Sequence, residues 1–545
     1  MSAPAQIEYP EKIDAAVLKV AGVVVLGSIM SILDITVVNV ALPSLQTTFT
    51  GASDPLPYST VAWTVTAYTL ALATVIPLTG WAADRFGTKR LYMMALAFFT
   101  AGSVLCAAAS SIELLIAFRV LQGLGGGLLM PLGMTIMTRA AGPNRMGRLM
   151  AILGIPMLLG PILGPILGGY LIDAVSWHWI FLINLPLGLA ALMYAAWALP
   201  QDRPEPTESF DLIGMLLMSP GLALFLYGIS SIPGEGTFYS AKVGVPATVG
   251  LAMMIAFVFY SFKPAHPLLD FRLFKNRNLT ISVLTMFLFA LAFFGGLLLI
   301  PTYFQQVRGE SALHAGLLVA PQGLGAMLTM PLAGALSDKY PVGRIVPFGL
   351  LTITGGMFSL TRIDGHSSYW GHLIPTLFVM GLGMGMTMMP LMTSAIKTLT
   401  AHQVARGTTL LNITQQVASS IGVAIMSVVL TNGLNNSALI SQARGFGEAA
   451  AKITDPGAMA ALLADYPKVA EIMGPFGQNA EAAAQALQTA VRDAMGLVFA
   501  HTFTVAFGLI ALTLIPALFL PRKREESHLL DDEGDGHSAA PVLLP

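Results

Sequence analysis

The sequence predicts an all-α membrane protein with fourteen transmembrane helices: two six-helix bundles with two extra helices between them. Three observations support this fold class. The chain of 545 residues is 55% hydrophobic and 10% charged, with a mean hydropathy of +0.72, whereas a soluble protein carries about 25% charged residues. Apolar segments of spanning length recur along the chain. The two halves of the chain also repeat each other.

A helix that crosses a bilayer needs roughly 20 consecutive, mostly apolar residues. Six segments of that length fall in an N-terminal bundle, predicted over 18–199: 18–43, 58–80, 91–110, 114–137, 148–171 and 178–199. A linker, 200–277, holds two extra spans, 212–231 and 243–261. Six more fall in a C-terminal bundle, predicted over 278–520: 279–304, 314–336, 345–361, 371–396, 407–430 and 499–520.

The remaining segments are polar. Residues 1–17 carry no cleavable signal pattern, so we expect a short N-terminal tail and a first span that is retained. The alanine-rich loop 431–498 is amphipathic, and Pro456, Pro467 and Pro475 divide it into short helices. Residues 521–545 begin with a basic anchor and continue as a tail of disordered composition.

The lysines and arginines predict the orientation of the chain. With the amino terminus inside, the inner loops and tails hold 20 of the 28 basic residues. Inner loops carry such an excess in membrane proteins. Because the number of spans is even, we expect both termini to be cytoplasmic.

The internal repeat shows as constant offsets between similar segments. Pro43 and Pro301 are 258 residues apart in "LPSLQ" and "IPTYFQ", and "GLGGG" at 123–127 returns as "GLGMG" at 381–385. Gly164 and Gly422 keep the same offset, and "GWAADRFGTKR" at 80–90 returns 254 residues later. Two six-helix halves related in this way form a parallel repeat of the kind found in transporters.

Several function classes are excluded by composition. A net charge of -1 argues against a nucleic-acid partner. Cys106 is the only cysteine and lies in an apolar run, which predicts a core residue. All nine histidines lie at or beyond the ends of spans, and no paired carboxylates, metal-ligand spacing or nucleotide loop is present. We therefore expect neither an enzyme nor a bound metal or cofactor.

Four motifs carry a family resemblance over residues 18–520. They are "LDITVVNVALP" (33–43), "GWAADRFGTKR" (80–90), "RVLQGLGGG" (119–127) and "GPILGPILGG" (160–169). In this order, and with fourteen spans, the chain resembles the EmrB/QacA-type drug:proton antiporters of the major facilitator superfamily. The resemblance implies the major facilitator fold, a multi-pass protein of the bacterial inner or plasma membrane, and transport by alternating access.

The loop motif predicts a gate at the cytoplasmic ends of the second and third spans. A carboxylate there can pair with basic groups or with a helix N-terminus in one conformation and release them in the other. The alternative is that the motif only anchors the topology of the chain, a role that needs the basic residues but not Asp84. The predicted gating residues, with their counterpart in the second half, are Gly80, Asp84, Arg85, Gly87, Lys89, Arg90 and Asp338.

Asp34 and Arg119 are ionisable residues deep within spans, where a charge costs roughly 2.5–3.5 kcal/mol on insertion scales. At 1.5 Å per residue, Asp34 lies about 13 Å and Arg119 about 8 Å from the outer end. The second half has Ala292, Leu377 and Met380 where the first half has Asp34, Arg119 and Gln122. Charged residues that only one half carries indicate a functional role, and the resemblance implies that Asp34 and Arg119 take part in proton coupling. A structural ion pair is the alternative.

In the fifth span, Gly160, Gly164 and Gly168 are four residues apart, so they share one face of the helix, with Pro161 and Pro165 beside them. Glycine on one face lets a partner helix pack closely, and the prolines favour a bend. The resemblance implies an antiporter motif, which favours export. The full predicted set is Gly154, Gly160, Pro161, Gly164, Pro165, Gly168 and Gly169.

Polar and methionine side chains within spans predict the cargo cavity, since flexible thioethers suit varied ligands. The methionines serve equally well as core residues. The candidate cavity residues are Asn39, Gln122, Met384, Met388, Asn412, Gln415 and Gln416. At position 178 the chain has histidine where relatives carry arginine. We expect His178 to be an interfacial residue without a role in coupling.

The sequence therefore predicts a proton-coupled antiporter that exports lipophilic or amphiphilic small molecules, with protons and the lipid bilayer as its other partners. Alternatives are export of an endogenous lipid, siderophore or other metabolite, and uptake by proton symport. The loop 431–498 is open to three interpretations: a lid, a docking element for an extracytoplasmic adaptor, or a spacer.

Overall fold

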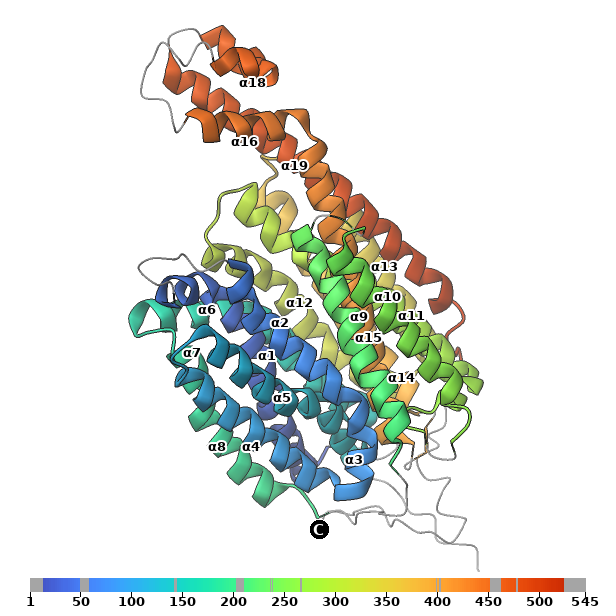
Figure 1. Cartoon of the computed structure of the whole chain (residues 1–545). Helices are drawn as coiled ribbons and strands as arrows, with labels where there is room; N and C mark the ends of the chain where they lie inside the picture. The colour runs from blue at the N-terminus through green and yellow to red at the C-terminus, as the bar shows by residue number, and fades with distance from the viewer. Residues whose placement is uncertain are drawn as a thin grey trace, which may run out of the picture.

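The computed structural model is built from helices, and the described residues contain no strand (Figure 1). It describes residues 13–49, 58–141, 145–201, 210–235, 237, 239–264, 267–397, 399–400, 403–450, 462–476 and 479–523. Within them, thirteen helical segments are long and apolar enough to span a membrane. The remaining predicted span, 148–171, lies within α6, a helix of 29 residues. The predicted fold class is thereby confirmed.

The first bundle comprises the helices that correspond to the first six predicted spans. They are α1 (Ala15–Phe49), α2 (Tyr58–Val75) with η1 (Ile76–Leu78) and α3 (Thr79–Phe86), α4 (Thr88–Ala107), α5 (Ile112–Ala141), α6 (Met146–Ala174), and α7 (Trp179–Leu182) with α8 (Asn184–Ala198). The second predicted span is thus divided at Pro77, which lies in the short 3-10 turn between α2 and α3.

The second bundle follows the extra helices α9 (Leu212–Glu235) and α10 (Ala241–Tyr260). Its elements are η2 (Phe271–Lys275), α11 (Arg277–Gln306), α12 (Ala312–Lys339), α13 (Val342–Leu360), η3 (Tyr369–Leu373) with α14 (Ile374–Lys397), α15 (Val404–Asn436) and α19 (Ala480–Ala517). Helix α15 ends and α19 begins well inside the predicted loop 431–498, so both helices continue beyond the predicted spans.

Contacts between helices confirm the internal repeat. A methyl group added at Gly123 of α5 would lie 2.6 Å from the carbonyl oxygen of Tyr68 in α2. In the second bundle, Gly381 of α14 meets the carbonyl oxygen of Gln322 in α12 in the same way. These residues keep the predicted offsets of 258 and 254. Two further contacts repeat with the same offsets. Gly127 with Leu72 corresponds to Gly385 with Ala326, and Gly125 with Ala95 corresponds to Gly383 with Gly349.

The extra helices lie across one junction between the bundles (Figure 1). On the side of the first bundle, Tyr227 of α9 stacks on Trp63 of α2, with ring centroids 5.5 Å apart. On the side of the second bundle, Ile232 and Val243 pack in one apolar cluster with residues of α15. Helices α9 and α10 are therefore attached to both halves.

The two ends of the bundles differ in charge. We call the end with Arg85, Arg139 and Arg145 the basic end. Both ends of the described part of the chain lie there, since Asp14 pairs with Arg145 at 2.9 Å and the carbonyl of Pro521 accepts a hydrogen bond from the backbone of Gly343. The backbone N–H of Val17 and the Arg145 guanidinium hold the pKa of Asp14 below its usual range.

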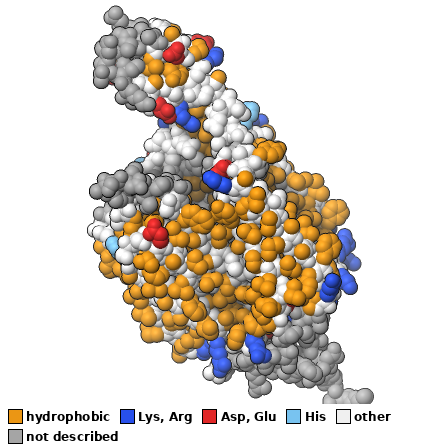
Figure 2. Space-filling view, in the orientation of Figure 1, with side chains coloured by type: hydrophobic (Ala, Val, Ile, Leu, Met, Phe, Trp, Pro, Cys, Tyr) orange, Lys and Arg blue, Asp and Glu red, His pale blue; other side chains and the backbone are white. Residues whose placement is uncertain are grey.

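At the opposite end, which we call the loop end, helices α16 (Ala438–Ala450) and α18 (Pro467–Met473) project with the start of α19 (Figure 1). Pro467 begins α18 and Pro475 lies in η4 (Gly474–Phe476), as the sequence predicts; Pro456 lies outside the described residues. Between the two ends, hydrophobic side chains cover the surface of the bundles (Figure 2), as a lipid-facing surface requires.

Candidate functional site

A buried ion pair lies inside the first bundle. Asp34 of α1 accepts a hydrogen bond from Arg119 of α5, and the two side chains are 0% exposed. The sequence placed both residues at similar depth but did not show contact; the structure brings them together. A buried pair is stable only when hydrogen bonds satisfy its remaining polar atoms.

Gln122, one turn from Arg119, supplies several of those bonds. Its amide nitrogen donates to Asp34 at 2.7 Å and to the Ser103 hydroxyl at 2.6 Å, while its amide oxygen accepts from Arg119 at 2.7 Å. The carbonyl of Thr64 accepts from Arg119 Nε at 2.9 Å. Gln122 therefore joins both charges, which makes it part of the ion-pair site as well as a candidate cavity residue.

Three aromatic and polar residues complete the site. The Arg119 guanidinium lies over the ring of Tyr68, 4.1 Å from its centroid, and Tyr68 shares a 3.1 Å hydrogen bond with Ser31. Asn184 at the start of α8 lies 3.5 Å from Asp34. Sequence reasoning missed these residues. Polar side chains within predicted spans were the available signal, and it does not say which of them face one another.

The second bundle is apolar at the equivalent positions. Ala292, Leu377 and Met380, which stand where the first half has Asp34, Arg119 and Gln122, are all buried hydrophobic residues. The two bundles therefore share their helix packing but only the first holds this ion pair, as the sequence comparison predicts.

At the basic end, Asp338 of α12 connects the second bundle to the first. Its carboxylate accepts a 2.8 Å hydrogen bond from the backbone N–H of Gly147, at the start of α6, and lies 3.6 Å from Arg148 of the same helix. Lys397 of α14 lies 3.8 Å from it within the second bundle. An anion at a helix N-terminus is stabilised by the helix dipole, so Asp338 holds the two bundles together here.

Asp84 occupies the equivalent position in the first bundle. It lies 3.7 Å from Arg139 of α5, as Asp338 lies beside Lys397. One turn earlier, a methyl group added at Gly80 would lie 3.4 Å from the Arg406 side chain of α15. The basic end is thus held at two related junctions, α3 with α15 and α12 with α6.

The other residues of the loop motif act within the first bundle or face solvent. Gly87 has a φ of +83°, a conformation that favours glycine, which confirms the predicted tight turn. Lys89 donates to the carbonyls of Ala196 and Leu199 at the end of α8, at 2.8 and 2.6 Å. Arg85 and Arg90 are exposed.

The glycines of α6 have two different partners. Gly160, Gly164 and Gly168 pack against α1, where an added methyl group at Gly164 would collide with Thr36, two residues from Asp34. Gly154, nearer the basic end, packs against Met330 of the other bundle. An added methyl group at Gly169 would meet nothing within 4 Å. Pro161 and Pro165 lie within α6, but their side chains are outside the described part.

The bundles are closed against each other at the basic end. In α5, every residue from 125 to 138 except Met130 is buried, and in α14 every residue from 383 to 397 except Met386 is buried. Thr135 and Thr408 share a 2.9 Å hydrogen bond across the junction. The structure therefore shows a conformation in which this end is shut.

The predicted cavity residues lie in different environments. Met384 and Met388 are buried in the main apolar cluster. Asn412 contacts Met134 of the first bundle across the closed junction, at 3.2 Å. Asn39 is exposed on α1, and Gln415 and Gln416, like Asn412, are half-buried on α15, whereas Gln122 is fully buried. The structure does not bring the seven together into one cavity.

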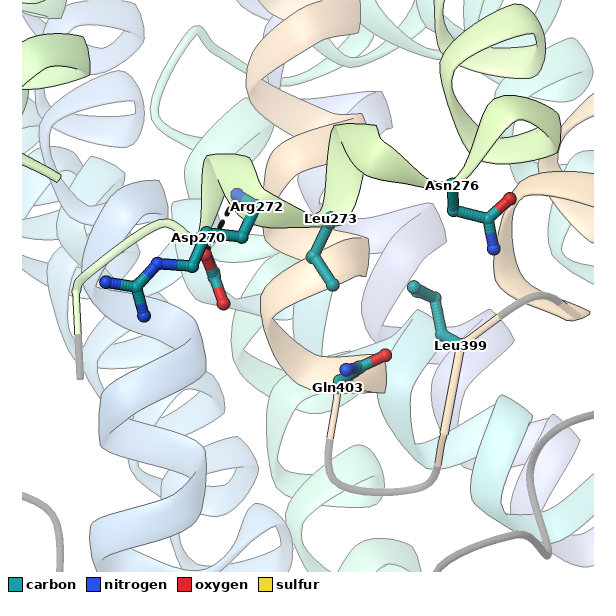
Figure 3. Close-up of a pocket in the computed structure, with 6 residues that line it drawn as sticks. All are labelled: Asp270, Arg272, Leu273, Asn276, Leu399 and Gln403. Atoms are coloured by element: carbon teal, nitrogen blue, oxygen red, sulfur yellow. Dashed lines mark hydrogen bonds between the residues drawn. The ribbon is translucent and has the colours of Figure 1, made fainter. Parts of the chain in front are cut away.

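A cavity of about 270 Å³ lies at the basic end, away from Asp34, between η2 and the turn before α15 (Figure 3). Leu273, Leu399 and Gln403 point into it, whereas the Arg272 guanidinium points away (Figure 3). Within the described ranges, no group of three or more His, Cys, Asp or Glu side chains is placed to hold a metal ion. At the loop end, His178 stacks on Trp177.

Comparison with known proteins identifies relatives along most of the chain. Residues 24–423 match the Major Facilitator Superfamily. A protein of Mycobacterium tuberculosis described as "Multidrug resistance protein B homolog" is 47% identical over 533 residues, covering 96% of this chain and 93% of its own length. The "Multidrug export protein EmrB" of Haemophilus influenzae is 31% identical, covering 75% of this chain and 79% of its own.

Solved structures support the fold. The human organic anion transporter MFSD10 aligns with a TM-score of 0.55 at 16% identity, covering 92% of this chain and all of its own. The proton:xylose symporter XylE aligns with a TM-score of 0.54 at 14% identity, covering 95% of this chain and 99% of its own. At these identities the likeness concerns the arrangement of helices alone.

Proposed function

This chain belongs to the major facilitator superfamily, and on that premise we propose that it is a proton-coupled exporter of lipophilic or amphiphilic small molecules. It is a multi-pass membrane transporter, and its bacterial relatives include the two above that are described by multidrug resistance or export. The observation that carries the proposal is the buried Asp34–Arg119 pair, which has no counterpart in the second bundle.

Two opposing influences act on the carboxyl group of Asp34. Removal from water favours its neutral form, whereas the guanidinium of Arg119 and the amide of Gln122 favour its charged form. A small movement of α1 or α5 changes this balance. Asp34 therefore takes up a proton when the pair is opened toward one side of the membrane and loses it toward the other.

Helix α6 provides the mechanical link between this pair and the bundle junction. Its glycines pack against α1 beside Asp34, while Gly154 and Gly147 pack against α12 of the second bundle. A shift of α6 at the junction is thereby passed to α1. In the proposed orientation the basic end is cytoplasmic, so the closed conformation separates the transport path from the cytoplasm.

Everted membrane vesicles test the proposal with ethidium as a cargo of the expected class. We expect ethidium to enter vesicles that are acid inside and to make protons leave them, at a rate that Asp34→Asn abolishes although the protein is still inserted. Glu448→Gln, in the projecting loop, is the matched control and leaves the rate unchanged. Cargo and protons that move in the same direction would show a symporter, and wild-type rates in Asp34→Asn would refute the coupling role.

A further inference from the structure

A buried amide oxygen in the second bundle has no partner among the described residues. The side chain of Gln322 in α12 is 3% exposed as a residue, and its amide oxygen is fully buried. No described residue donates a hydrogen bond to that oxygen. Buried polar atoms in folded proteins are nearly always hydrogen-bonded, so an exception calls for a partner that is absent from this conformation.

The internal repeat shows why the amide lacks a partner. Gln322 is the counterpart of Tyr68, and the carbonyl oxygens of both residues contact the equivalent glycine of the neighbouring helix. In the first bundle Tyr68 meets Arg119 and Ser31. The counterparts of those two residues are Leu377 and Phe289, which are buried and apolar. The helix packing is kept, but the polar partners are missing.

A structural role does not explain a glutamine at this position. Replacing an unpartnered buried amide by an apolar side chain of the same shape stabilises a folded chain or leaves it unchanged. Methionine has that shape and is already used at Met380 and Met384 of the neighbouring α14. The unpartnered amide oxygen is therefore a cost in the closed conformation.

We propose that Gln322 binds cargo, by accepting a hydrogen bond from an N–H or O–H group of the transported molecule. Two features favour a position on the transport path. It lies on α12, the helix whose Met330, Gly334 and Asp338 form the junction with the first bundle. It also corresponds in the repeat to a residue of the Asp34–Arg119 site.

The unpartnered atom of Gln322 is a hydrogen-bond acceptor, so it favours cargo molecules that carry a hydrogen-bond donor. A lipophilic molecule with an aromatic amine, a protonated amine or a hydroxyl group can donate to it. A quaternary onium ion without any N–H or O–H cannot. This inference rests on the proposed export function and adds to it a preference for lipophiles that donate hydrogen bonds.

Two cationic probes separate these classes: ethidium carries two aromatic amino groups, and tetraphenylphosphonium carries no donor. In Gln322→Met we expect the KM for ethidium transport, and the Kd for ethidium on the purified protein, to rise about tenfold, the usual worth of one hydrogen bond. Both values for tetraphenylphosphonium stay within twofold. Gln322→Leu serves as the second variant should the methionine protein insert poorly.

Ser219→Ala is the matched control, because Ser219 in α9 also has a buried oxygen without a partner in the described structure. Both substitutions raise thermal stability or leave it unchanged, but only the change at Gln322 weakens ethidium binding. Unchanged ethidium affinity, or equal weakening for both probes, overturns the proposal. If the wild type transports neither probe, the export function fails, and the binding comparison still decides the role of Gln322.

Discussion

The junction at the basic end makes a quantitative prediction for Asp338→Asn. The substitution keeps the shape of the side chain but removes its charge. Lys397 belongs to the same bundle as Asp338, so their contact is present in both the closed and the open conformation. Losing it therefore does not change the ratio of the two conformations. The contacts that distinguish the closed conformation are those with Gly147 and Arg148 of α6.

Their combined value follows from ordinary magnitudes. A hydrogen bond to a charged group is worth about 1 kcal/mol more than one to a neutral group. The pair with Arg148, which is about a quarter exposed, adds at most about 1 kcal/mol. The closed conformation therefore loses at most about 2 kcal/mol, which multiplies the ratio of open to closed molecules by up to about thirty.

Alkylation of a buried cysteine measures this ratio. Thr408→Cys, in a chain whose Cys106 is replaced by serine, places a thiol at the closed junction, where Thr408 is fully buried. With opening fast relative to alkylation, the rate of labelling follows the open population. We expect Asp338→Asn to raise that rate by up to about thirtyfold, and Asp493→Asn at the loop end to leave it unchanged. A rate within twofold of the parent would refute the assigned role of Asp338.

Three further predictions concern single residues. Gly164→Ala forces α6 away from α1 and lowers proton-coupled transport at least about tenfold, while Gly169→Ala, which meets nothing, retains the parental rate in the same vesicle assay. Gly87→Ala places a side chain at a φ of +83° and lowers the free energy of unfolding by about 1–3 kcal/mol in denaturant titration; equal stability would show that the turn relaxes. The Tyr369 hydroxyl holds the pKa of Glu310 below its usual value of 4.5, so this contact stabilises the chain above that pH and is lost as the pH falls through the lowered pKa. Thermal unfolding of Tyr369→Phe should show lower stability than the parent at pH 7 by about 1 kcal/mol, with the difference shrinking below pH 4.5; a constant difference would contradict the assignment.

The fold was predictable because its causes are local. A span needs an apolar run, and such runs are visible in the sequence wherever lipid must be faced. The repeat offsets also predicted which glycines would pack equivalently, since a glycine without a side chain marks a close approach of two helices. The division of the second span at Pro77 was missed, because its apolar pattern continues through the break.

The site was predictable only in part. Depth along a helix follows from residue counting, so Asp34 and Arg119 could be placed at one level. Their contact depends on how α1 and α5 rotate within the bundle, which the sequence does not specify for two residues 85 positions apart. For the same reason, spacing showed that the glycines of α6 share a face but not that this face meets α1. The contacts of Lys89 with the carbonyls of Ala196 and Leu199, at the end of α8, were likewise not visible in the sequence.

The most direct test of the account is a count of protons released when cargo binds. The purified protein in weakly buffered detergent, with a pH-indicating dye, receives ethidium at a series of pH values. The account predicts release of about one proton per molecule bound in the wild type and none in Asp34→Asn, with ethidium still bound by both. Equal release by both proteins, or binding by the wild type without any release, would contradict the claim that Asp34 couples proton and cargo.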